Sequence, residues 1–241
     1  MKATERSRVA LVTGGSRGIG RAVAEALLRE GWTVHLCSRS PDSVRAALGE
    51  LAREHGERVR GRECDVRDAE AVERLVEEVV AESGRLDCLV NNAGLGRFGS
   101  VEELPLEEWR EVLDTNLTGA FYVLRAAARR MVGRGGGWIF NIASLAAVNP
   151  FAGGAAYNAS KFGLLGLSEA AMLDLRPKGV RVATILPGSV DTDFRPPGGH
   201  TSTEWMLKAE DVARAVVDLL AYPARALPSR VELRPTRPPG G

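Results

Sequence analysis

The stretch VALVTGGSRGIG, residues 9–20, decides the fold. Its first five residues, Val9 to Thr13, are apolar or β-branched, which predicts a buried strand. The glycines that follow permit a tight turn and let the backbone approach a phosphate closely. An amphipathic segment from Ile19 to Arg29 predicts a helix whose N-terminal N–H groups and dipole favour an anion. A strand, a glycine-rich turn and a helix in this order indicate a dinucleotide-binding site.

The rest of the chain repeats the order of strand and helix. Short runs rich in Val, Leu and Ile alternate with longer segments whose apolar residues recur every three or four positions. This pattern predicts one α/β domain over residues 1–241, a Rossmann-type doubly wound sheet of about seven parallel strands with helices on both faces. The further strands are expected at Thr33 to Cys37, Val59 to Cys64, Leu86 to Asn91, Gly137 to Ile142, Val180 to Leu186 and Arg230 to Leu233, and the further helices at Pro41 to His55, Asp68 to Ser83, Leu106 to Met131, Ala155 to Leu175 and Ala209 to Ala221.

Composition limits the classes of partner. Lys and Arg number 32 and Asp and Glu 31, so no charge excess favours nucleic acid or an anionic membrane, and we expect a small-molecule partner. The sequence MKATERSR at the start has no apolar signal-peptide core, and no later apolar run is long enough to cross a bilayer, which predicts a cytoplasmic protein. Cys37, Cys64 and Cys88 form no C-x-x-C pair and are expected to be buried thiols; no metal is expected.

The end of the second predicted strand indicates which dinucleotide binds. An acidic residue there would bind the ribose 2′-hydroxyl of NAD and repel a 2′-phosphate, but this chain has Ser38 and Arg39. Together with Arg17 of the first turn, Arg39 could form charge-assisted hydrogen bonds to a 2′-phosphate. We therefore expect NADPH/NADP+ rather than NAD; the alternative is that Arg39 is a solvated loop residue.

Several motifs follow the first turn in a fixed order and together resemble one family. The turn T-G-x-x-x-G-x-G at 13–20, with Asp65, the run Asn91-Asn92-Ala93-Gly94, Asn116, Ser144, the run Tyr157-Asn158-Ala159-Ser160-Lys161 and Pro187-Gly188, resembles the short-chain dehydrogenase/reductase family. Within it the chain is similar to 3-oxoacyl-acyl-carrier-protein reductases and related carbonyl reductases. The resemblance implies that residues 1–94 mainly bind the cofactor and residues 95–233 carry the catalytic and substrate-binding groups.

The same resemblance implies a set of cofactor-binding residues. Asp65 and Val66 would flank the adenine, residues 92–94 would pack along the cofactor, residues 187–190 with Thr192 would meet the nicotinamide, and Lys161 would hold the ribose hydroxyls. The full expected set is Gly14, Ser16, Arg17, Gly18, Ile19, Gly20, Ser38, Arg39, Asp65, Val66, Asn92, Ala93, Gly94, Tyr157, Lys161, Pro187, Gly188, Val190 and Thr192.

Tyr157 and Lys161 are four residues apart in a predicted helix, so both project from one face. The pKa of a free tyrosine is about 10, and a nearby ammonium together with an oxidised nicotinamide would favour the phenolate. We expect Tyr157 to exchange a proton with the oxygen of a carbonyl substrate, while Ser144 holds that oxygen. The resemblance assigns to Asn116 a water that reprotonates through Lys161. A local kink or close helix packing at Gly119 is the alternative reason for weak helix formers there.

The substrate is less well determined. Residues 189–208, which include Pro196, Pro197, Gly198 and Gly199, are expected to form a mobile lid, and the Pro-rich tail 234–241 cannot remain in a sheet. A ketone or 3-oxoacyl group would suit an apolar pocket, although ordinary core or lid packing is the alternative for each candidate residue. The candidates are Phe98, Leu145, Val148, Phe151, Phe194 and Trp205.

Protein partners and rival functions stay open at this point. Arg129, Arg130, Arg134 and Lys178 could form a landing patch for an acyl carrier protein, or simply a solvated charged face. The resemblance also implies a homodimer or homotetramer built on the helices of Asn116 and Tyr157. The alternatives to a reductase are a non-catalytic NADPH-binding sensor or scaffold and an NAD-dependent alcohol dehydrogenase. A serine hydrolase is excluded because Ser144 lacks a G-x-S-x-G context.

Overall fold

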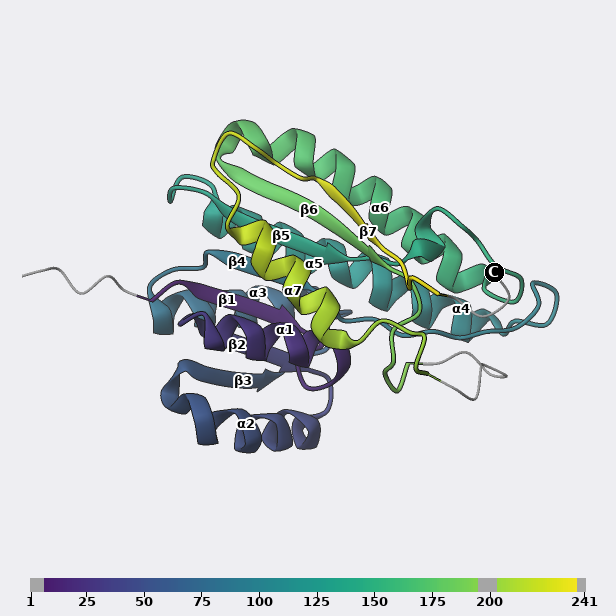
Figure 1. The fold of residues 1–241 in the computed structure, drawn as a ribbon, viewed down its shortest axis with the longest axis horizontal. Coiled ribbons are helices and arrows are strands. Elements are labelled where there is room, and N and C mark those ends of the chain that lie inside the picture. Colours follow the sequence, from purple (N-terminus) through teal and green to yellow (C-terminus); the bar gives the residue numbers. More distant parts are fainter. Residues whose placement is uncertain (1–6, 195–202, 238–241) are drawn as a thin grey trace, which may run out of the picture.

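The computed structural model describes residues 7–194 and 203–237 (Figure 1). Its centre is a seven-stranded sheet in the order β3-β2-β1-β4-β5-β6-β7, in which every neighbouring pair is parallel. This is the doubly wound sheet that the sequence predicted. The strands are β1 (Val9–Thr13), β2 (Thr33–Ser38), β3 (Val59–Glu63), β4 (Cys88–Asn91), β5 (Gly137–Ile142), β6 (Val180–Pro187) and β7 (Arg230–Leu233).

Helices cover both faces of the sheet, because its central strands are apolar on both sides. One core lies between the sheet and α1, α2 and α7, and the other between the sheet and α3, α5 and α6; α4 packs beside α6. Figure 1 shows α1 and α7 together on one side of the strands. The helices are α1 (Gly18–Arg29), α2 (Pro41–His55), α3 (Ala69–Ser83), α4 (Leu106–Leu113), α5 (Ala120–Met131), α6 (Ala155–Leu175) and α7 (Ala209–Leu220), with short 3₁₀ turns at Gly56–Arg58, Leu145–Ala147 and Arg176–Lys178.

Most predicted boundaries hold to within two residues, and one predicted element is wrong. Asp68 is the N-cap of α3, because its side chain accepts hydrogen bonds from the backbone N–H groups of Glu70 and Ala71. The single helix expected from Leu106 to Met131 is instead α4 and α5 joined by a π-helical turn, Asp114–Gly119. A Cβ at Gly119 would lie 2.8 Å from Cγ2 of Val66, so the close packing considered for this glycine is present.

The strand order reverses between β1 and β4, which are neighbours in the sheet although two strands separate them in sequence. In such sheets the crevice beyond the carboxyl ends of the strands, at this switch point, is where ligands bind. In residues 7–194 and 203–237, no helix has the length and apolar character needed to span a membrane.

Candidate active site

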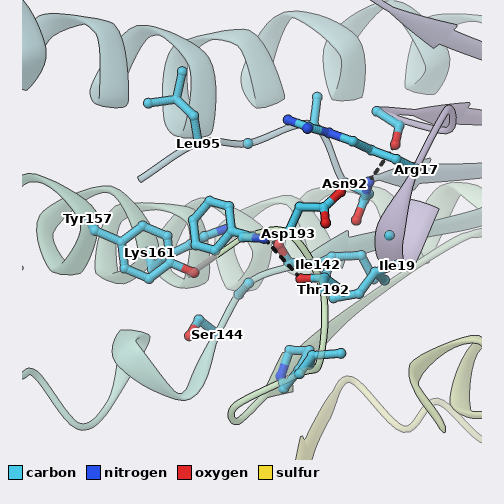
Figure 2. Close-up of a pocket in the computed structure, with 18 of the residues that line it drawn as sticks. Arg17, Ile19, Asn92, Leu95, Ile142, Ser144, Tyr157, Lys161, Thr192 and Asp193 are labelled. Carbon is cyan, nitrogen blue, oxygen red and sulfur yellow. Dashed lines mark hydrogen bonds between the residues drawn. The ribbon is translucent and has the colours of Figure 1, made fainter. Parts of the chain in front are cut away.

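A cavity of about 1010 Å³ lies beyond the carboxyl ends of the strands. Figure 2 shows Ser144, Tyr157 and Lys161 towards one end of this cavity and Arg17 and Asn92 towards the other. Most of the residues predicted from sequence line it. They are Gly14, Ser16, Arg17, Gly18, Ile19, Ser38, Arg39, Asp65, Val66, Asn92, Ala93, Gly94, Phe98, Ser144, Leu145, Phe151, Tyr157, Lys161, Pro187, Gly188, Val190, Thr192, Phe194 and Trp205.

Three predicted residues do not line the cavity. Gly20 lies behind the first turn, where a Cβ would come within 2.4 Å of both the Asn92 side-chain nitrogen and the Gly14 carbonyl oxygen. Val148, expected in the substrate pocket, packs instead against the core cluster beneath it. Asn116 is buried, with its side chain bonded to the backbone N–H and C=O of Leu95, both at 2.8 Å, and to the Ser160 hydroxyl. The close packing at Gly20 and the burial of Asn116 are decided by neighbours distant in sequence.

The first turn fits a pyrophosphate. Gly14 and Gly18 have φ angles of +61° and +54°, a region that residues with a side chain rarely adopt. Arg17 precedes α1 in extended conformation and places no side-chain cap on the helix, so the N–H groups at the start of α1 remain available. The first residues of α1, Gly18 and Ile19, line the cavity, so their N–H groups and the helix dipole can hold an anion there.

The ends of β2 and β3 form the opposite extreme of the cavity from Tyr157. Arg39 is 59% exposed at its side chain and lies 3.5 Å from the Glu111 carboxylate, a long and solvated ion pair. The Arg67 guanidinium donates two hydrogen bonds to the Asp65 carboxylate. These bonds keep the pKa of this carboxyl below its ordinary value. No acidic residue ends β2, where Ser38, Arg39 and Ser40 line the wall.

The catalytic candidates come from two segments that both follow β5 in the chain. Ser144 follows β5 and caps the short turn after it, while Tyr157 and Lys161 lie one turn apart in α6. The Ser144 hydroxyl lies close enough to the Tyr157 hydroxyl to lower the pKa of the phenol. The Lys161 Nζ donates to the Ile142 carbonyl oxygen at 3.0 Å and lies 5.7 Å from the centre of the Tyr157 ring. The structure thus brings together a proton donor, a second hydroxyl and an amine.

Burial shifts the pKa values of Tyr157 and Lys161. It raises the pKa of Tyr157 to about 12, and the nearby Ser144 hydroxyl only partly offsets this effect. Burial also lowers the pKa of Lys161 to about 8. Without the oxidised nicotinamide that the expectation includes, the loss of water around Tyr157 disfavours the phenolate, and the expectation for the cofactor-bound site stays a prediction. Tyr157 is protonated at neutral pH, the form that donates a proton.

Several residues that line the cavity were not predicted from the sequence. Thr115, in the π-helical turn, has a buried hydroxyl with no hydrogen-bond partner among the described residues. Arg234 and Pro235 follow β7 and could have been predicted, because ligands bind at the carboxyl ends of parallel strands. The thiols of Cys37 and Cys64 are buried and free, as expected. The wall residues that were not among the predicted site residues are Cys37, Ser40, Ser43, Cys64, Leu95, Thr115, Ile142, Ala143, Ala146, Asn149, Asp193, Met206, Arg234 and Pro235.

The described parts of the expected lid are joined at their base. Leu207 donates its N–H to the Ser189 carbonyl, and Asp191 donates to the Leu207 carbonyl. The Lys208 ammonium lies 2.8 Å from the Asp191 carboxylate. Pro196, Pro197, Gly198 and Gly199 lie outside the described residues, as does the tail beyond 237. The described segments place Phe194 and Trp205 on the cavity wall.

The four basic residues considered for a carrier-protein landing patch do not lie at the mouth of the cavity, which agrees with the alternative of a charged face. Arg134 and Lys178 precede β5 and β6 and so lie at the amino ends of the strands, the edge opposite to the cavity. Arg129 and Arg130 pair with Glu73 and Glu77 of α3 at 3.4 and 2.6 Å. These four residues form no basic surface at the mouth of the site.

The geometry places the chain among the Rossmann-type oxidoreductases, and comparisons give the family. The family model for short-chain dehydrogenases matches residues 8–202. The 3-oxoacyl-acyl-carrier-protein reductase of Aquifex aeolicus is 35% identical over 189 residues, which cover 78% of this chain and 76% of the relative. The D-threitol dehydrogenase of Mycolicibacterium smegmatis is 41% identical over 187 residues, covering 78% and 72%. The chain belongs to the short-chain dehydrogenase/reductase family and is an oxidoreductase similar to 3-oxoacyl-acyl-carrier-protein reductases.

Solved structures agree in fold and differ in cofactor. An actinorhodin polyketide ketoreductase with NADPH superimposes with a TM-score of 0.88 at 35% identity, covering 97% of this chain and 98% of the other. An NAD+-bound xylitol dehydrogenase superimposes with a TM-score of 0.86 at 30% identity, covering 96% and 100%. The fold is therefore compatible with either dinucleotide, and the side chains at the end of β2 must distinguish them.

Proposed function

We propose that this protein is an NADPH-dependent carbonyl reductase in which Tyr157 is the proton donor. The observation that carries the proposal is the contact between the Tyr157 and Ser144 hydroxyls at one end of a cavity that begins, at its other end, with the glycine turn. A ketone oxygen bound between the two hydroxyls would receive a hydrogen bond from each. Both donors strengthen their interaction as negative charge develops on that oxygen, which lowers the barrier to reduction.

The residues present fit NADPH along the whole cavity. The turn at Gly14 and Gly18 would hold the pyrophosphate, Arg17 and Arg39 the 2′-phosphate, and Lys161 the ribose next to the nicotinamide. When bound, NADPH supplies the hydride. Tyr157 then transfers its proton to the carbonyl oxygen, and Lys161 supplies positive charge beside the tyrosinate that remains. The family resemblance assigns to Asn116 a water that returns a proton through Lys161; because the Asn116 side chain is bonded to Leu95 and Ser160, the backbone carbonyl of Asn116 would have to hold that water.

The choice of NADPH over NAD rests on charge. A 2′-phosphate carries negative charge, and the end of β2 offers Arg39 without an acidic neighbour on that strand. The NAD-bound neighbour shows that the same fold accepts the other cofactor, so an NAD-dependent alcohol dehydrogenase is the second candidate. A cytoplasmic homo-oligomer completes the proposal.

The first prediction tests the proton donor. Tyr157→Phe should lower kcat for NADPH-dependent carbonyl reduction by at least about a hundredfold, because a general acid contributes on the order of 10² to 10⁴ in rate. Cofactor affinity, followed by NADPH fluorescence, should stay within about threefold, since the phenol hydroxyl is not part of the phosphate site. Tyr222→Phe is the matched control, because this tyrosine is exposed and does not line the cavity.

The carbonyl substrate for this test comes from a screen of NADPH oxidation that covers 3-oxoacyl thioesters, ketones, aldehydes, quinones and sugars. Undiminished turnover in Tyr157→Phe would refute the assignment of the proton donor. Tight NADPH binding without oxidation by any carbonyl compound would instead support a non-catalytic sensor.

A further inference from the structure

We propose that the substrate carries an aromatic ring, which binds among Phe98, Phe151 and Phe194 while its carbonyl lies between Ser144 and Tyr157. This inference rests on the proposed reductase function and adds the chemical class of the substrate. These three phenylalanines and the Tyr157 ring are called the aromatic cluster below.

The aromatic cluster is assembled from segments far apart in the chain. Phe98 follows β4, Phe151 precedes α6 and Phe194 follows β6. The Tyr157 ring centre lies 5.8 Å from that of Phe98, 6.3 Å from that of Phe151 and 5.5 Å from that of Phe194. Every phenylalanine of the cluster thus contacts the ring that would donate the proton. A ring placed among them is therefore within reach of the reacting hydroxyl.

The backbone near the cluster leaves space for rings. A Cβ at Gly96 would lie 2.6 Å from Cζ of Phe98 and 2.9 Å from Cζ of Phe194. A Cβ at Gly154 would lie 2.6 Å from Cε2 of Phe151. Because each ring packs directly on a glycine backbone, its orientation is restricted before any ligand binds, which reduces the entropy lost on binding.

The cluster leaves apolar surface uncovered beside the catalytic hydroxyls. Phe151 and Phe194 are each 42% exposed although both line the cavity. The ring centre of Phe98 lies 6.0 Å from that of Phe151, with the two rings tilted, and 6.4 Å from that of Phe194, with the two rings edge to face. The three rings therefore do not form a closed stack. An added aromatic ring can make edge-to-face contacts with more than one of these rings, which a saturated ring of similar size cannot.

The absence of charged side chains in the aromatic cluster also favours a neutral aromatic substrate. The aromatic cluster contains no charged side chain, and Lys161 behind the Tyr157 ring is already bonded to the Ile142 carbonyl. A carboxylate or phosphate placed among the three phenylalanine rings would lose its hydration without gaining a partner from those rings. Hydroxyl-rich sugars and polyols would meet the same penalty for each unpaired hydroxyl. A neutral aryl ketone fits these surroundings better than any of them.

The test compares two ketones that differ only in the ring. Benzylacetone and its ring-saturated cyclohexyl analogue have the carbonyl two methylene groups away from the ring, so the intrinsic reactivity of their carbonyls is alike. With NADPH and the whole protein, kcat/KM should be about tenfold higher for benzylacetone, the size expected for one or two favourable ring–ring contacts.

Leucine variants locate the effect. Phe98→Leu, Phe151→Leu and Phe194→Leu keep an apolar side chain but remove the ring, so each should reduce by about threefold the ratio of kcat/KM for benzylacetone to kcat/KM for the cyclohexyl ketone. Tyr222→Leu removes an exposed ring outside the cavity and should keep the full preference. A folding defect would lower both ketones together, and the ratio between them separates that case.

Binding gives a readout that does not depend on turnover. The Tyr157→Phe protein with NADPH should bind benzylacetone more tightly than the cyclohexyl ketone by calorimetry. Equal kcat/KM for the two ketones, or a preference unchanged in all three leucine variants, would overturn the aromatic subsite and leave the reductase assignment standing. If no carbonyl compound of any class oxidises NADPH, the proposed function itself fails, and the substrate class fails with it.

Discussion

Lys161 sets the pH range in which the site should hold its cofactor. Its ammonium is buried beside Tyr157, bonded to the Ile142 carbonyl, and burial lowers its pKa to about 8. The charged form attracts an anionic dinucleotide and supports the tyrosinate left after proton transfer. The neutral form does neither, so loss of this proton should weaken the site at mildly alkaline pH.

The second prediction follows from that pKa. Below about pH 8 Lys161 is already charged and NADPH affinity should vary little with pH; above it, binding must take up a proton, and the affinity should fall by up to about tenfold per pH unit. Calorimetric titration between about pH 7 and pH 9 measures this change. Lys161→Met, which cannot titrate, should show weaker and nearly pH-independent binding. The same slope in wild type and Lys161→Met would show that another group is responsible.

The third prediction concerns the preference for NADPH over NADH, which we attribute to Arg39. Arg39→Asp should weaken NADPH binding by at least about tenfold, because it removes a charge-assisted hydrogen bond and adds repulsion of the 2′-phosphate. NADH affinity should be unchanged or improved, since an acid at this position can accept the ribose hydroxyl. The matched control is Arg45→Asp on α2, which is exposed and outside the cavity. Equal affinity of the wild type for the two cofactors would disprove the NADPH assignment.

At the scale of elements, a buried polar network joins the carboxyl ends of three strands. The Thr13 hydroxyl accepts hydrogen bonds from the N–H groups of Asn92 and Ala93, both at 3.0 Å. The Asn91 side chain donates to the Asn141 side chain, which donates to the Ser168 hydroxyl of α6 at 2.8 Å. The network holds the ends of β1, β4 and β5 together with the helix that carries Tyr157. It therefore positions the glycine turn relative to the catalytic pair.

The fourth prediction tests the stability that this network contributes. Thr13→Val keeps the side-chain volume but leaves two buried N–H groups without an acceptor, so the free energy of unfolding should fall by about 1–3 kcal/mol. Urea denaturation measures it. Thr33→Val, at the partly exposed start of β2, is the control and should change the free energy by less than about 0.5 kcal/mol. An equal loss in the two variants would mean that the hydrogen bonds of Thr13 are not what matters.

At the same scale, the interruption between α4 and α5 shows what local pattern misses. Residues 106–131 have the apolar spacing of one helix, and the weak helix formers within it indicate only that some stability is lost. The wider π-turn at Asp114–Gly119 accompanies the close approach of Gly119 to Val66 and the bonding of Asn116 to Leu95. Both contacts join segments at least 20 residues apart, so no helical periodicity could reveal them.

At the scale of the molecule, the cavity is lined from both halves of the chain. The glycine turn and the ends of β2 and β3 supply one end, and segments after β4, β5 and β6 supply the other. Parallel strands bring these loops to one edge of the sheet, because every crossover returns the chain to the same side. The same geometry places the loops before β5 and β6 at the opposite edge, which is why Arg134 and Lys178 lie away from the site.

The sequence by itself determined the order of strands and helices, and it predicted the glycine turn and the candidate residues Ser144, Tyr157 and Lys161, because these depend on local spacing and on residue types with few other uses. Only the tertiary structure decided the protonation of Tyr157, the burial of Asn116 and the grouping of Phe98, Phe151 and Phe194 around one hydroxyl. Burial and ring contact depend on which distant segments meet, and that information lies in the packed chain rather than in any stretch of it.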